Sequence, residues 1–233
     1  MQVDALLARR TQAEVTVVHG INLLLWAFDS LASAQSDLPP LRSFSAQFNK
    51  FVYLGEYVEL LLTQQGLTGA RLNLSVDNAL RSEVTIEFGD AVEGLLAWAD
   101  SSLAPKSPLP AALDLSLEQM LERSGNLAFR MTVEQAATLF PAATKWLGAQ
   151  RIMALAASTY LGGMVCFGLH SIYSELLIKT CAESDSVGFL AFRMTKTCPR
   201  LRLVKREIPG GRLTGTVRSF VRTPPTASDY GEP

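Results

Sequence analysis

The sequence predicts an α+β fold in which two halves follow one plan, a buried helix followed by an antiparallel sheet. Three observations support it: an apolar helix near the N-terminus, segments whose side chains alternate in polarity, and a Pro- and Ser-rich stretch at mid-chain. The 233 residues suffice for two units of about 115 residues, because domains hold roughly 100–200 residues. A single α+β domain of another topology is the alternative.

The first half begins with a short β-branched strand at 11–18, followed by His19-Gly20. A helix then starts at Ile21 and is apolar on nearly every side, which is typical of a buried helix. Four segments with turn residues between them follow and predict an antiparallel meander with one face in water. They are 41–53, 57–65, 67–78 and 81–89.

Residues 101–126 predict a linker, because prolines and serines crowd its first part. The chain then divides into a first repeat at 1–100, a second repeat at 127–223 and a tail at 224–233. The tail is polar and rich in proline, so we expect it to be disordered. It leaves room for a fused reductase domain after residue 223.

The second half repeats the plan. It reads as a strand at 127–132, a helix capped by Thr132 and broken at Pro141, a small-residue helix ending at Gly162-Gly163, and a short apolar helix at 167–179. Three strands follow at 187–197, 200–208 and 212–222. On this interpretation His19 and His170 occupy matching helix entries.

Composition excludes several classes of protein. The net charge of −1 argues against a nucleic-acid binder driven by bulk charge, and no apolar run reaches the roughly 18–20 residues of a membrane span. The three cysteines include no CxxC pair, and the N-terminus has no secretory pattern. We therefore expect a cytoplasmic protein without a metal or redox cofactor.

The stretch VVHGINLLLWAFDSLA followed by LRSFSAQFNKFVYLGEYVEL resembles the MaoC-like group of hot-dog proteins, which includes (R)-specific enoyl-thioester hydratases. The stretch STYLGGMVCFGLHSIYSELLI, with GGRLTGTVRSFVRTPP, is similar to the second hot-dog of MaoC-like dehydratase domains fused ahead of short-chain reductases. The resemblance covers residues 13–223. It implies a double hot-dog with the two sheets joined side by side, and a hydro-lyase acting on acyl-CoA or an acyl carrier protein.

The chain departs from the active members of that group at one point. Those hydratases carry an Asp and a His about five residues apart, upstream of the hot-dog helix, to activate water. Neither half has this pair. Two alternatives therefore stay open: a non-catalytic acyl-binding or scaffolding module, and a hot-dog thioesterase that would use Glu175 or Asp29.

The candidate catalytic residues are His170, His19 and Ser171. A helix N-terminus lowers an imidazole pKa, and its free N–H groups polarise a carbonyl, so a histidine there suits a general base or an oxyanion donor. The alternative for each histidine is a buried structural side chain. The candidate substrate-binding residues are Gly168, Gly20, Tyr160, Cys166, Arg202 and Lys205.

A basic cluster accounts for the last two. Residues 193–222 hold nine Lys or Arg and one acid, which leaves 12 basic against 21 acidic residues elsewhere. Such a cluster suits the phosphates of coenzyme A or an acidic carrier protein, and equally an ordinary solvated sheet face. Nucleic acid and membrane are not expected partners, whereas a homodimer is left open.

Overall fold

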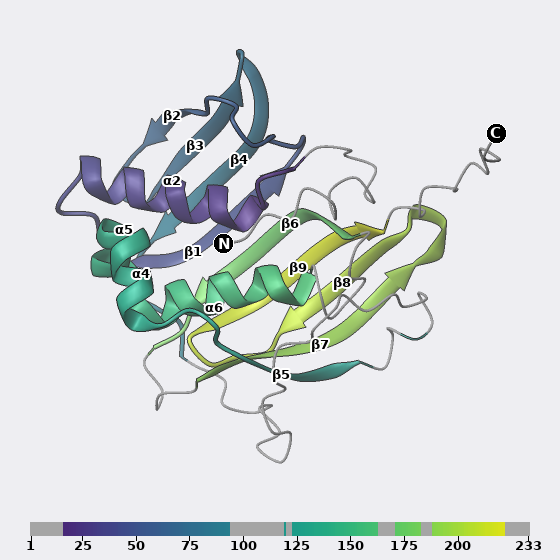
Figure 1. The fold of residues 1–233 in the computed structure, drawn as a ribbon. Coiled ribbons are helices and arrows are strands. Elements are labelled where there is room, and N and C mark those ends of the chain that lie inside the picture. The colour runs from purple at the N-terminus through teal and green to yellow at the C-terminus, as the bar shows by residue number, and fades with distance from the viewer. Residues whose placement is uncertain (1–15, 94–118, 120–122, 163–170, 183–187, 222–233) are drawn as a thin grey trace.

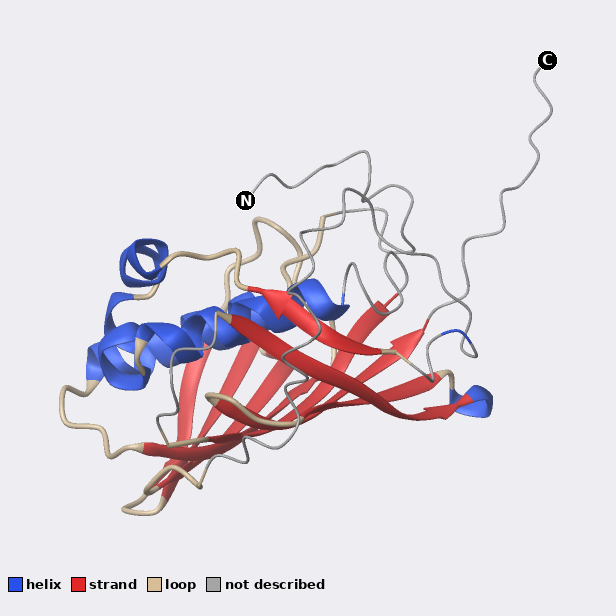
Figure 2. Cartoon of the chain, turned by 90° about the horizontal axis from the view of Figure 1, so that it is seen from below, coloured by secondary structure: helices blue, strands red, loops and turns tan. Residues whose placement is uncertain are grey.

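The computed structural model describes residues 16–93, 119, 123–162, 171–182 and 188–221. Within them, nine strands form one antiparallel sheet in the order β2-β3-β4-β1-β6-β9-β8-β7-β5 (Figure 1). The α-helices lie together on one face of this sheet (Figure 2). We call the other face the outer face.

The elements follow the predicted plan closely in the first half. There α2 is Gly20–Ala34, and the strands are β1 (Leu41–Phe48), β2 (Glu59–Gln65), β3 (Gly69–Val76) and β4 (Ala79–Phe88). The helices of the second half are α4 (Val133–Leu139), α5 (Pro141–Leu147), α6 (Ala149–Tyr160) and the 3₁₀ turn η3 (Pro199–Leu201). Its strands are β5 (Ser124–Ala128), β6 (Ser171–Thr180), β7 (Phe189–Cys198), β8 (Leu203–Ile208) and β9 (Leu213–Val221).

Helix α2 is buried on nearly all sides, as its sequence predicts. Its packed residues include Ile21, Leu25 and Phe28, each completely shielded from water, and Trp26 is its one large hydrophobic side chain with a sizeable exposed surface. Burial of such side chains contributes roughly 1.5–3 kcal/mol each. The helix therefore holds the first four strands around a shared core.

The two halves join through β1 and β6, which pair in antiparallel fashion along five residues of each strand, from Ser43↔Lys179 to Gln47↔Glu175. We call this pairing the β1–β6 seam. On the helix side of the seam, Ala46 and Leu176 face each other with no exposed surface. The expectation that the sheets of the two halves join side by side is confirmed.

The predicted helix at 167–179 is wrong, because residues 171–180 form strand β6. Leu176 and Ile178 point into the core while Leu177 and Lys179 are exposed, an alternation with a period of two. The segment pairs with β1 on one side and β9 on the other, so long-range pairing overrides its local helical spacing. The central helix of the second half is α6.

Other boundaries shift by a few residues. The strand expected at 127–132 lies at Ser124–Ala128. Thr132 does cap the next helix, in a capping box with Gln135, and Pro141 begins a new helix as its ring geometry favours. Of the strand expected at 11–18, the described part contributes the single bridge Val17↔Tyr53.

The division of the chain into repeats, linker and tail stays a prediction, since residues 94–118 and 222–233 lie outside the described residues. Within the described part, no helix is long and apolar enough to cross a membrane.

Candidate functional site

The candidate site lies where α2 begins and α6 ends. These two helices run side by side in opposite directions over the sheet (Figure 1). His19 is the N-cap of α2 and adopts an extended backbone, while its carbonyl accepts the N–H groups of Asn22 and Leu23. Its side chain makes no capping hydrogen bond, so it does not satisfy the first-turn N–H groups.

The backbone before α2 is held in place by the segment after β1. The Val18 N–H donates to the Val52 carbonyl at 2.8 Å, and the Leu54 N–H donates to the Thr16 carbonyl at 2.9 Å. This pairing fixes the approach of the chain to His19. The entry of α2 is therefore a supported position rather than a free loop end.

Two aromatic side chains, Phe48 of β1 and Tyr173 of β6, lie against the start of α2 and the end of α6. We call this pair the aromatic wall. The Phe48 and Tyr173 rings meet edge to face with centroids 6.3 Å apart, across the open end of the β1–β6 seam. A Cβ added to Gly20 would lie 2.6 Å from Phe48 Cε1, and one added to Gly162 would lie 2.4 Å from Tyr173 Cε2. Both glycines therefore permit helix ends to touch aromatic faces.

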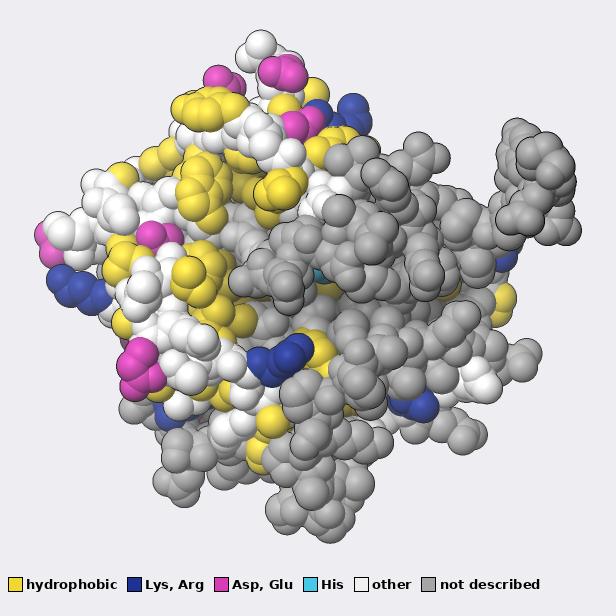
Figure 3. Space-filling view, viewed as in Figure 1, with side chains coloured by type: hydrophobic (Ala, Val, Ile, Leu, Met, Phe, Trp, Pro, Cys, Tyr) yellow, Lys and Arg dark blue, Asp and Glu magenta, His cyan; other side chains and the backbone are white. Residues whose placement is uncertain are grey.

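Tyr173 also ties α6 to the sheet, because its hydroxyl donates to the Ser158 carbonyl. Two residues further along α6, Tyr160 carries the Arg130 guanidinium over its ring, 5.1 Å from the centroid. Arg130 is exposed, so this end of the molecule presents a cation beside an aromatic ring. On the same side of the molecule, hydrophobic side chains gather over α2 (Figure 3).

The electrostatics favour a neutral imidazole at His19. The residue reaches the surface, yet desolvation by the surrounding protein lowers its pKa below the ordinary value of 6.5. At neutral pH the ring therefore has a free lone pair to accept a proton. The positive end of the α2 dipole acts in the same direction.

The opposite end of the helix pair is sealed by packing. Trp146 packs edge to face against Phe28 and Phe88, with centroids 5.8 and 6.4 Å apart, and its indole N–H donates to the Pro39 carbonyl. Arg151, in the first turn of α6, donates to the Cys181 carbonyl at 2.8 Å. The two ends of the helix pair thus differ. One end has His19, and the other is filled by packed hydrophobic side chains.

The sequence-predicted residues fall into three groups. His19, Gly20 and Tyr160 belong to the site end just described. His170, Gly168 and Cys166 lie outside the described residues, and Ser171 is the first residue of β6. Arg202 caps η3 in a left-handed conformation, and Lys205 lies on the outer face of β8, across the sheet from the helices.

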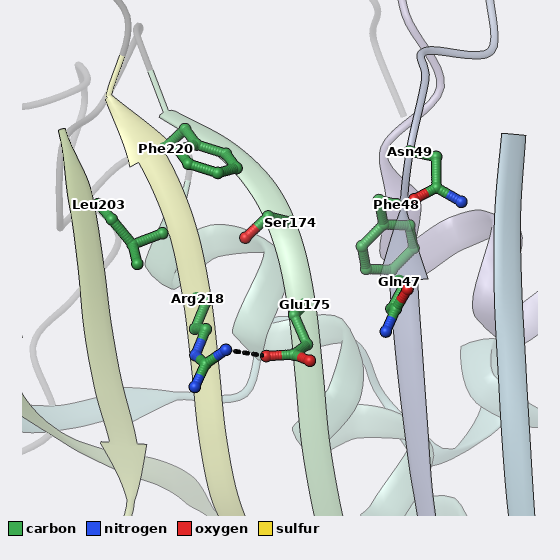
Figure 4. Close-up of a pocket in the computed structure, with 8 residues that line it drawn as sticks. All are labelled: Gln47, Phe48, Asn49, Ser174, Glu175, Leu203, Arg218 and Phe220. Atoms are coloured by element: carbon green, nitrogen blue, oxygen red, sulfur yellow. Dashed lines mark ion pairs between the residues drawn. The ribbon is translucent and has the colours of Figure 1, made fainter. Parts of the chain in front are cut away.

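Glu175 also lies on the outer face and forms an ion pair with Arg218, with 2.8 Å between Glu175 Oε2 and Arg218 Nη1. Glu175 and Ser171 both belong to strand β6 and not to the helix expected at 167–179. Gln47, Glu175 and Arg218 lie in a row on β1, β6 and β9 (Figure 4). They line a shallow pocket of about 360 Å³ whose other residues are Phe48, Asn49, Ser174, Leu203 and Phe220.

Asp29 has a structural partner in this arrangement. Its Oδ1 accepts the backbone N–H of Ala143 at 2.9 Å, in the first turn of α5. It therefore joins α2 to α5 and satisfies a helix-start donor. This position is toward the sealed end of the helix pair.

Sequence reasoning missed Phe48, Tyr173, Gly162 and Arg130. Gly162 was visible only as a helix end, whereas its close approach to Tyr173 depends on the position of β6. The sequence predicts Gly20 as a substrate-binding residue. The group that approaches it in the structure is the Phe48 ring.

No protein-family model matches the sequence, and no curated protein matches it. Solved structures do match over most of the chain. The tesB protein of Mycobacterium avium subs paratuberculosis is 13% identical with a TM-score of 0.51, covering 89% of this chain and 88% of its own.

Two crystal forms of the dehydratase domain of a mycocerosic acid synthase-like PKS are also similar. They are 13% and 12% identical with TM-scores of 0.53 and 0.54, and cover 90% and 89% of this chain and 84% of their own. Likeness at this level of identity concerns the arrangement of the backbone. With its long antiparallel sheet and central helices, the chain has the hot-dog fold.

Proposed function

We propose that this chain is a double hot-dog protein that acts on an acyl thioester, with His19 as the proton acceptor. The first repeat supplies α2 and β1–β4, and the second supplies α6 and β5–β9. The reaction is the reversible dehydration of a 3-hydroxyacyl thioester to an enoyl thioester. The carrier is coenzyme A or an acyl carrier protein.

The observation that carries the proposal is the position of the His19 imidazole at the entry of α2. Desolvation lowers its pKa, so the ring is neutral at neutral pH and its lone pair is able to take a proton from a substrate. The first-turn N–H groups beside it receive no side-chain cap from His19. A thioester carbonyl placed there is polarised by those N–H groups and by the helix dipole.

The proposed step balances with one base. The His19 imidazole takes a proton from the α-carbon of the 3-hydroxyacyl group, and the carbonyl oxygen gains negative charge at the α2 N-terminus. The double bond forms as the bond from the β-carbon to its hydroxyl breaks. The imidazolium returns its proton to the leaving hydroxyl, which departs as water.

The thioesterase alternative is less well supported. It requires a carboxylate to position water, and Asp29 is already engaged by Ala143 near the sealed end. Glu175 forms an ion pair with Arg218 on the outer face. Asp29 lies toward the other end of the helix pair from His19, and Glu175 lies on the opposite face of the sheet.

The comparisons fit acyl-thioester chemistry in general. The matched structures include a dehydratase domain of a PKS, whose backbone arrangement is similar to that of this chain. The cation at Arg130, stacked on Tyr160, gives this end of the molecule a contact for a phosphate of the carrier.

The test is hydration of crotonyl-coenzyme A, which is monitored as a decrease in the absorbance of the conjugated thioester. Release of free thiol is measured in parallel. We expect hydration by the unmodified chain, and loss of at least 100-fold in His19→Ala, a range typical of a general base. His19→Gln is the conservative variant and should also be inactive because it cannot accept the proton. Lys145→Glu, at an exposed position of α5, is the control.

Three results contradict the proposal. Loss of hydration in His170→Ala but not in His19→Ala would move the base to the second histidine. Thiol release without hydration would make the protein a thioesterase. Binding of an acyl ligand without turnover of any thioester would leave the non-catalytic module.

A further inference from the structure

We propose that a second copy of this chain packs against the outer face of the sheet, about a two-fold axis parallel to the strands and along the β1–β6 seam. The strand registers fix the order of charges across that face, and this order matches a second copy turned about such an axis. It does not depend on the proposed function. In the described part of the chain, no helix covers this face (Figure 2).

The first charge row crosses the sheet from β4 to β8. The registers place Glu83 beside Gln47, Gln47 beside Glu175, and Glu175 beside Arg218, with Lys205 next. Acidic side chains therefore lie on the first half and at the seam, and basic ones on the second half.

A neighbouring row has a second pair of charges. It runs Arg71, Thr85, Ser45, Leu177, Thr216, Glu207 on β3, β4, β1, β6, β9 and β8. Here the first half carries the cation Arg71, and the second half carries the anion Glu207, which pairs with Arg193 of β7 next to it. Leu177, at the seam in the middle of this row, is an exposed hydrophobic residue at 41%.

Rotation about an axis along the seam places β4 opposite β9 of the other copy, and β3 opposite β8 of the other copy. Each charge row then faces the same row of the other copy. Glu83 then faces Arg218 of the second copy, and Arg71 faces Glu207. A two-fold interface repeats each contact, so four ion pairs would form around two adjacent Leu177 side chains. A two-fold axis in the sheet plane perpendicular to the strands would instead set each half on itself, with Glu83 facing β4.

The distances suit sheet packing. Strands lie about 4.8 Å apart and stacked sheets about 10 Å apart, so β4 and β9 each lie about 7 Å from the axis. An aligned packing angle near 30° displaces facing residues there by about 4 Å, which Glu and Arg side chains span. Glu83 and Arg71 form no ion pair with other described residues, whereas Arg218 and Glu207 each pair within their own chain, with Glu175 and Arg193. Across the interface, Arg218 and Glu207 would therefore each be shared between two opposite charges.

An acidic carrier protein is the competing occupant of the basic half. It would account for Arg218 and Lys205 but not for Glu83 or the exposed Leu177. A second copy accounts for both halves of the face at once, so the charge order favours it.

The experiment measures the mass of the full chain by sedimentation and by light scattering over a range of concentrations. We expect a dimer that weakens as salt is raised. Glu83→Arg and Arg218→Glu should each raise the dimer dissociation constant roughly tenfold or more, because two contacts become repulsive in each. Asp37→Arg and Lys145→Glu, on exposed sites away from the outer face, are the matched controls.

Mixing the two variants gives the decisive readout. Equimolar Glu83→Arg and Arg218→Glu chains should form a mixed dimer with near-normal affinity, since every facing pair is then attractive. Far-UV circular dichroism checks that each variant is folded. Three results would each overturn the proposal: a monomeric unmodified chain, an unchanged dimer in both variants, or no recovery on mixing. If the chain is a monomer and Arg218→Glu abolishes turnover of carrier-protein substrates but not of coenzyme A substrates, the face belongs to the carrier.

Discussion

At the scale of single residues, His19 links protonation to stability. Its pKa is lowered in the folded protein by desolvation, whereas in the unfolded chain it stays near 6.5. Below that value the unfolded chain binds more protons than the folded one, so the free energy of unfolding falls as pH decreases from about 6.5 toward the folded pKa. Above 6.5 both states are neutral at this ring, and the contribution disappears.

The prediction is a smaller pH dependence in His19→Gln. Comparing urea unfolding at pH 7.5 and 5.5, we expect the loss of stability in the acid to be greater in the unmodified chain. In the unmodified chain, activity should decrease below pH 6.5, as the His19 ring becomes protonated at its lowered pKa. An identical pH dependence of stability in both proteins would show that the ring does not titrate differently on folding.

Gly20 shows how one missing Cβ shapes the site. Gly20→Ala brings a methyl group to 2.6 Å from the Phe48 ring, so we expect a loss of about 1–3 kcal/mol in the free energy of unfolding. Phe48→Leu in the same chain should recover part of this loss. Gly66→Ala, where nothing lies within 4 Å, is the control; equal effects of the two alanines in thermal unfolding would contradict the packing argument.

At the scale of elements, Asp29 separates a structural role from a catalytic one. Asp29→Ala removes the acceptor for the Ala143 N–H and should cost about 1–2 kcal/mol. Asp29→Asn keeps an oxygen at that place and should retain most of the stability. Turnover of a thioester that survives in both variants would agree with a structural role, while its loss in Asp29→Asn at unchanged melting temperature would point to carboxylate chemistry.

The sequence predicts elements well where one local pattern dominates. The apolar α2 and the alternating β3, β4 and β9 are within a few residues of their predicted ranges. β6 was misassigned because Ile172, Leu176 and Leu177 fit a helix as well as a strand. Its pairing with β1, more than 120 residues away along the chain, decides between the two.

The candidate site was predictable in part for the same reason. His19-Gly20 stands at a helix start that local sequence reveals. The aromatic wall was not predictable, because Phe48 and Tyr173 meet only once the two halves share a sheet. Contacts of this kind depend on the register of distant strands, which periodicity does not encode.

At the scale of the whole molecule, the seam makes the two halves one cooperative unit. Leu176 is fully buried opposite Ala46, so Leu176→Ala should cost about 2–5 kcal/mol. We expect far-UV circular dichroism and tryptophan fluorescence to report one shared transition, lowered equally for both signals. Separate transitions for the two signals would mean that the halves unfold independently.

The β1–β6 seam has a consequence for how strongly its two sides must attract each other. Two separate chains would lose translational and rotational freedom on pairing, whereas two halves of one chain meet at an effective concentration of roughly millimolar or above. A seam of only five paired residues, with polar Ser43, Ser45 and Gln47 along its outer side, is sufficient under that condition. Cutting the chain between β4 and β5 would remove this advantage, and the fragments should then reassociate only at high concentration.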